Sequence, residues 1–96
     1  MKARIVVLCS MLGACATQLT DAGSQVRVNR SAEEVAHCKR IKFIYETRGS
    51  VSDGVAEATR AAMNDAAAAG ANTIYVQSSS VGARGSSVVA TAYSCK

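Results

Sequence analysis

The chain has 96 residues, a formal net charge of +4 and neither tryptophan nor proline. This length allows one small domain, and it excludes a large enzyme, a multi-domain chain and a polytopic membrane protein. Although 49% of the residues are apolar, many are alanine and only one is phenylalanine, so few large side chains can fill a core. The basic residues are too few and too scattered for a nucleic-acid binder.

The N-terminus has the pattern of a secretory signal peptide. Lys2 and Arg4 precede an apolar run over residues 5–12. A basic start, a short apolar segment and small residues are typical of such signals, and the run is far below the about 20 residues that span a bilayer. We therefore expect residues 1–14 to be removed. Eleven basic residues less these two leave nine, which against seven acidic residues give the mature chain a net charge of +2.

The residues at the expected cleavage point, Leu12-Gly13-Ala14-Cys15, resemble the lipobox of bacterial lipoproteins. This resemblance implies that Cys15 becomes the first residue and is acylated, with palmitate among its acyl chains. Several acyl chains together hold a protein on a membrane, whereas a single chain binds only marginally. The alternatives are an ordinary signal peptide with an incidental cysteine, or acylation of Cys9, which follows the bulky Leu8. Ala16 replaces the Asp typical of inner-membrane lipoproteins, which indicates the periplasmic face of the outer membrane.

Two further cysteines, Cys38 and Cys95, remain in the mature chain. An even pair in an oxidising compartment indicates one disulfide, closing a loop of about 58 residues that contributes about 4 kcal/mol in the chain-entropy model. His37, beside Cys38, raises the alternatives of a metal site or free redox thiols. Because neighbouring strand residues point to opposite faces and no CxxC or HxxxH spacing is present, we expect no metal ligand and no cofactor.

The first part of the expected mature chain contains a linker and two strands. Residues 15–24 are expected to be the lipidated cysteine with a short tether, and residues 25–96 a single domain. The alternation in residues 25–29 predicts a first strand with Val26 and Val28 inward. Ser31 and Glu34 match a capping box, so one helical turn can start there. The β-branched and aromatic residues 38–47 predict a second strand. Its two faces carry Ile41, Phe43 and Tyr45, and Lys42, Ile44 and Glu46.

Residues 52–69 predict the one long helix. Ser50 or Ser52 can cap its start, and Gly70 suits the left-handed residue that ends it. Because the apolar side is mostly alanine, we expect the helix to pack closely on a sheet rather than serve as a membrane or partner helix. The apolar side is Val55, Thr59, Ala62, Met63, Ala66 and Ala69, and the polar side is Asp53, Glu57, Arg60 and Asn64, with Asp65 toward its edge.

The C-terminal part predicts two more strands. Residues 73–77 form the third strand, residues 78–86 are rich in serine and glycine and predict a mobile loop, and residues 87–95 form the fourth strand. The order strand-strand-helix-strand-strand predicts an α+β domain with one helix on a small sheet. A bond from Cys38, at the start of one strand, to Cys95, at the end of another, would make these strands antiparallel neighbours.

Several features together resemble a family of small Gram-negative lipoproteins that carry domain of unknown function 4156. They are the lipobox, the Gly-Ser-Gln-Val-Arg-Val segment at residues 23–28, Cys38 before a strand, the helix followed by Gly70-Ala71-Asn72, and the ending Tyr93-Ser94-Cys95. The helix-Gly-Ala-Asn-strand pattern is also similar to the sensor lipoproteins of the Rcs envelope-stress phosphorelay, although those have two disulfides and a long proline-rich linker. The resemblance implies an anchored α+β domain and assigns no activity.

No arrangement typical of a catalytic site is found in the sequence. The single histidine has no Ser-His-Asp spacing, and residues 81–85 lack the Lys-Ser/Thr of a phosphate loop. Glu33 and Glu34 are expected in a solvated turn. We therefore expect a non-enzymatic binding or envelope-maintenance module that meets the membrane through its lipid, has an envelope protein partner and binds no nucleic acid. The alternatives are an envelope-stress sensor acting through a protein partner, and a periplasmic metal or redox protein using Cys38 and Cys95.

Overall fold

The computed structural model describes residues 17–49 and 53–96. The expected signal peptide, Cys15 and the two serine caps proposed for the helix lie outside this part of the chain. In the described part, the elements are η1 (Gly23–Gln25), β1 (Arg27–Asn29), η2 (Ala32–Val35), β2 (Lys39–Arg48), α2 (Gly54–Ala68), β3 (Thr73–Gly82) and β4 (Gly85–Ser94).

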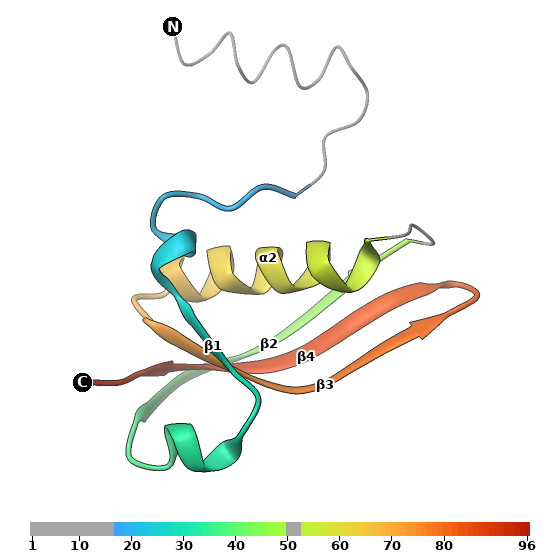
Figure 1. Ribbon diagram of the computed structural model, residues 1–96. Helices are drawn as coiled ribbons and strands as arrows, with labels where there is room; N and C mark the ends of the chain where they lie inside the picture. The colour runs from blue at the N-terminus through green and yellow to red at the C-terminus, as the bar shows by residue number, and fades with distance from the viewer. Residues whose placement is uncertain (1–16, 50–52) are drawn as a thin grey trace, which may run out of the picture.

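One mixed sheet of four strands, in the order β1-β3-β4-β2, carries α2 on one face (Figure 1). β1 runs parallel to β3, whereas β3 and β2 both run antiparallel to β4. The expected α+β domain, with one helix packed on a small sheet, is confirmed. The expected helical turn after the first strand is η2, but Ser31 makes no side-chain capping bond there.

The core between α2 and the sheet is built largely from alanine. Ala58, Ala62 and Ala66, one helical turn apart, are fully buried along one stripe of α2. Small side chains on both layers let the helix lie close to the sheet. Because the packing is tight, even one added methylene group would disturb it. The buried partners on the sheet are Ile44, Ile74, Val76, Val88, Ala90 and Ala92.

The C-terminal end of α2 follows the prediction at Gly70, whose φ is +89°. The Ala71 N–H donates to the Ala66 carbonyl at 2.9 Å, and the Gly70 N–H donates to the Ala67 carbonyl at 3.0 Å. These two bonds form a Schellman motif, which satisfies carbonyls that the helix leaves without partners. Ala69, expected on the buried side, is exposed because the chain has already left the helix there.

The prediction of a mobile loop over residues 78–86 is wrong. β3 and β4 form one long hairpin whose last pair is Gly82↔Gly85, which leaves Ala83 and Arg84 as its turn. A bulge between Val76 and Ser78 shifts the register within it. Residues 77–82 are exposed, so this part of the strand buries no apolar side chains and its sequence lacks the apolar alternation typical of a strand. Backbone pairing with β4 holds the segment in place.

A disulfide joins Cys38 and Cys95, whose Cα atoms are 4.6 Å apart. It connects the residue before β2 with the residue after β4, next to the Lys39↔Ser94 pair. The predicted bond and the predicted antiparallel pairing of these strands are both confirmed. Asn72, which follows α2, helps to place this end because its Oδ1 accepts the Cys95 N–H at 2.8 Å.

Candidate functional site

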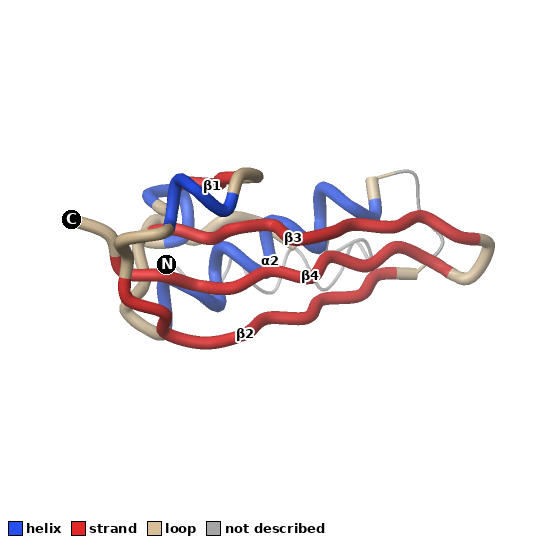
Figure 2. The backbone as a smooth tube through the Cα atoms, turned by 90° about the horizontal axis from the view of Figure 1, so that it is seen from below, coloured by secondary structure: helices blue, strands red, loops and turns tan. Residues whose placement is uncertain are grey.

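The face of the sheet turned away from α2 is uncovered in the described part of the chain, except beside β1, where η2 lies (Figure 2). We call it the open face. Ile74 and Ala92 are buried under α2, so alternation turns their strand neighbours toward the open face. Its main residues are Arg27, Asn29, Arg40, Phe43, Tyr45, Thr73, Tyr75, Val89, Thr91 and Tyr93.

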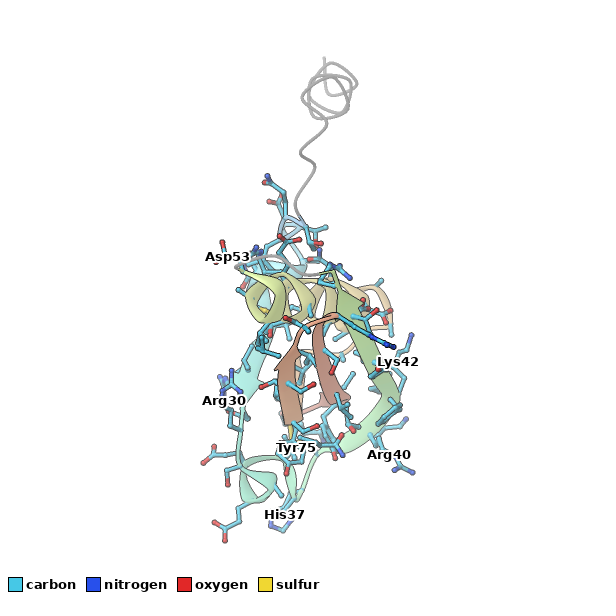
Figure 3. The ribbon with its side chains drawn as sticks, turned by 90° about the vertical axis from the view of Figure 1, so that its right-hand side faces the viewer. Arg30, His37, Arg40, Lys42, Asp53 and Tyr75 are labelled. Atoms are coloured by element: carbon cyan, nitrogen blue, oxygen red, sulfur yellow. A yellow bond between two sulfur atoms is a disulfide. The ribbon has the colours of Figure 1, made fainter. Side chains whose placement is uncertain are left out.

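All four aromatic side chains of the protein, three Tyr and one Phe, lie on the open face. A row across the sheet pairs Phe43 with Thr91, and Thr91 with Tyr75. Tyr75 is seen in Figure 3 on the side of the sheet away from the helix. Phe43 and Tyr45 are each 61% exposed. Neighbouring exposed aromatic side chains are typical of an interaction surface.

A bulge near the start of β2 decides which of its side chains reach the open face. The register shifts between Arg40 and Lys42, so Ile41 leaves the alternation and packs against the core. The expected grouping of Ile41 with Phe43 and Tyr45 is therefore wrong for Ile41. Lys42 turns toward α2, where its Nζ lies 3.1 Å from the Asp65 carboxylate.

The charges of the four strands are divided between the two faces of the sheet. Glu46, the one carboxylate within these strands, faces α2 and lies 3.5 Å from Arg48. The strand positions of the open face contain Arg27 and Arg40 and no carboxylate. At the centre of this face Thr91 is only 6% exposed and donates to Gln77 Oε1 at 2.6 Å. The open face is therefore aromatic and rich in hydroxyl and amide groups. Its strands carry no carboxylate on this face, and Glu33 and Glu34 of η2 line a cleft with Arg27 at its edge.

A shallow depression of about 530 Å³ lies at the hairpin end of the open face. Its lining includes the hydroxyl groups of Tyr45, Thr47, Ser80 and Ser87, together with the guanidinium of Arg84 in the hairpin turn. Ser80 and Ser87 form a hydroxyl–hydroxyl hydrogen bond of 2.7 Å across the two strands. No acidic residue is among its lining residues.

A cleft of about 480 Å³ lies at the opposite end of the sheet, around the disulfide. Glu33, Glu34, His37 and Lys39 line it, so its charges are mixed. Within residues 17–49 and 53–96, no three His, Cys, Asp or Glu side chains gather as metal ligands would. Cys38 and Cys95 are paired in the disulfide at this cleft, where they serve as a structural link.

The N-terminal strap, which we define as residues 17–25, lies along the outer side of α2 (Figure 1). Arg60 Nε donates to the Thr17 carbonyl at 2.9 Å. Asn64 donates from Nδ2 to the Gln18 carbonyl at 2.7 Å and accepts the Thr20 N–H at 2.9 Å. The described part of the expected tether is therefore not a free linker but is bound to the domain.

Two further contacts fix the strap. Arg48 Nη2 donates to Thr17 Oγ1 at 2.8 Å, which links the strap to the end of β2. Gly23 is buried against Asn64, and a Cβ at this position would overlap the Asn64 Oδ1 atom. The polar side of α2 thus has a structural use that an amphipathic pattern alone does not reveal. The glycine and asparagine gave no periodic signal, so sequence reasoning missed this contact.

Comparison of the chain with family models, with curated proteins and with solved structures finds no match in any of the three. No helix in the described residues has both the length and the hydropathy to cross a membrane. The domain thus has two distinct sides: an aromatic, hydroxyl-rich open face on one, and the N-terminal strap on the other.

Proposed function

We propose that this chain is a lipoprotein anchored through Cys15 to the periplasmic face of the outer membrane, where it acts as a non-catalytic binding module of the envelope. The observation that carries the binding role is the open face, on which the four aromatic side chains gather. Aromatic rings bring a large contact area at a low cost in conformational entropy, which suits a recognition surface. The resemblance to the lipoproteins with domain of unknown function 4156 belongs to the same proposal.

The N-terminal strap supports one orientation of this surface. Thr17, two positions after Cys15, is bonded to Arg48 and Arg60 on the helix side of the domain. Two residues of extended chain reach about 7 Å. A lipid on Cys15 would therefore enter the bilayer near the outer side of α2. The open face, on the opposite side of the sheet, would then point away from the bilayer and into the periplasm.

Cys15→Ala tests the anchor. We expect the variant to remain as an uncleaved precursor that takes up no labelled palmitate, because the thiol that accepts the lipid is gone. Cys9→Ala is the matched control: it removes a cysteine from the same segment and should leave labelling and membrane fractionation unchanged. Palmitate on Cys15→Ala, or its loss from Cys9→Ala, would overturn the assignment of Cys15.

A further inference from the structure

We propose that the depression at the hairpin end of the open face is a binding site for a carboxylate-bearing glycan, and that the occupant is peptidoglycan. The inference deepens the proposed function and rests on the periplasmic location given there. Peptidoglycan is the polymer in that compartment that combines sugar rings with free carboxylates on its peptide stems. Three features of the depression carry the assignment. An aromatic ring can contact the sugar rings, hydroxyl groups can bond the polar groups of the sugars, and a guanidinium can bind the carboxylates.

Tyr45 supplies the apolar contact. Its side chain is 61% exposed at the edge of the depression, and its neighbour Phe43 on the same strand is exposed to the same extent. The C–H face of a pyranose ring is apolar and flat, so it can cover an aromatic ring and remove apolar area from water. Two exposed rings in succession along β2 give a surface on which consecutive sugars can lie.

The hydroxyl groups of Thr47, Ser80 and Ser87 supply the polar contacts. All three side chains line the depression beside Tyr45, and their hydroxyls can both donate and accept hydrogen bonds. The hydroxyl and acetamido groups of sugars likewise both donate and accept hydrogen bonds. Among the residues that line the depression, Val81, which is 78% exposed, is the one large aliphatic side chain, whereas five lining residues carry a hydroxyl group. This composition favours a glycan over a protein partner.

Arg84 supplies the charge. It is exposed in the hairpin turn, and among the described residues no ion pair involves it. Arg48, the other cation of the depression, is already engaged by Glu46, Glu57 and Thr17. A guanidinium binds a carboxylate through two parallel hydrogen bonds. Because no acidic residue lines the depression, a carboxylate on the ligand meets attraction without local repulsion.

The shape of the site favours a polymer over a free sugar. Pockets for small molecules enclose most of the ligand, whereas this depression is shallow and continues into the open face. A shallow surface can contact several successive units of a polymer, and the exposed rings of Phe43 and Tyr45 extend the contact area along β2. With the anchor on the helix side, the depression would also point toward the periplasm.

The test is co-sedimentation of the full-length lipidated protein, in mild detergent, with purified peptidoglycan sacculi. We expect the wild-type protein to sediment with the sacculi and soluble muramidase fragments to compete. Tyr45→Ala should weaken binding about tenfold, the scale of an aromatic truncation in a recognition surface. Tyr45→Phe keeps the ring and should weaken binding at most about fivefold, because the one hydrogen bond that it removes is worth about 1 kcal/mol, which is about fivefold in affinity. All variants are checked for folding by circular dichroism.

The charge is tested by a matched pair. Arg84→Gln should weaken binding several-fold, whereas Arg30→Gln removes an exposed cation that does not line the depression and should have no effect. The proposal is overturned if the wild-type protein does not bind sacculi, if Tyr45→Ala binds as wild type, or if the two arginine variants behave alike. It is also overturned if Tyr45→Ala instead abolishes a dimer seen by analytical ultracentrifugation, because the open face would then bind a second copy.

These results are independent of the anchor. Sedimentation in detergent reports the glycan site, and palmitate labelling reports acylation of Cys15. Sacculus binding without labelling would refute the anchor and keep the site, whereas labelling without sacculus binding would refute the site and keep the anchor.

Discussion

Replacing both Cys38 and Cys95 with alanine should remove a large share of the stability of this domain. The disulfide closes a loop of 57 sequence positions, which corresponds to about 4 kcal/mol in the chain-entropy model. The core cannot absorb that loss easily, because its largest fully buried side chains are Ile44, Ile74 and Val88 and its helix contributes alanine. Small domains have a free energy of unfolding of about 5–15 kcal/mol, so the bond is a large share of the total.

Urea unfolding followed by circular dichroism measures this effect. With a slope of about 1 kcal/mol per molar, a loss of about 4 kcal/mol moves the midpoint down by about 4 M. Reductant should destabilise the wild-type protein by a similar amount and leave the double variant unchanged, which controls for effects of the substitutions themselves. A loss below about 1 kcal/mol would refute the argument that the disulfide compensates for an alanine-rich core.

Three further substitutions test other parts of the fold by the free energy of unfolding. Asn64→Ala should cost about 1–2 kcal/mol and speed hydrogen exchange in residues 18–23, because it removes the bonds that hold the strap; unchanged exchange would contradict this. Ala62→Leu should cost about 1–3 kcal/mol by overpacking, whereas the exposed Ala68→Leu should cost little, and equal costs would argue against close helix packing. Gly70→Ala should cost about 1 kcal/mol through its positive φ, while Gly49→Ala, with equal space around it, should not; a neutral Gly70→Ala would disprove the left-handed requirement.

The elements that the sequence predicted well are those with a strong local signal. The helix ends where Gly70 can take a left-handed conformation, and the strand beginning after Cys38 is marked by β-branched and aromatic residues. The pairing of Cys38 with Cys95 followed from an even count of cysteines, and it also implied that β2 and β4 are neighbours. Each of these features depends on a few residues close together in the sequence or on a single type of residue, and one physical cause dominates it.

The features that could not be predicted depend on contacts distant in sequence. The outer half of the hairpin is a serine-rich segment that resembles a loop, and only pairing with β4 makes it a strand. The bulge at Ile41 rotates that side chain into the core, although simple alternation places it beside Phe43. The strap depends on hydrogen bonds between Asn64 and residues more than 40 positions away. Local propensity contains none of this information.

The open face was only partly foreseeable. Alternation in β2 correctly grouped Phe43 with Tyr45, and in the structure Thr91 and Tyr93 of β4 pair with β2 on this same face. The strand order brings these two groups and Tyr75 together on one surface, and that order could not be obtained from alternation, which fixes faces but not neighbours. The depression at the hairpin end also required the hairpin itself, which the sequence had suggested as a loop.

The intact mass of the protein extracted from membranes tests the proposed lipoprotein most directly. We expect the mass of residues 15–96 plus acyl chains, less two hydrogens for the bond between Cys38 and Cys95. A mass for the uncleaved chain, or for a cleaved chain without acyl groups, would contradict the anchor and with it the orientation of the open face. Two free thiols in the same spectrum would contradict the structural role of the disulfide.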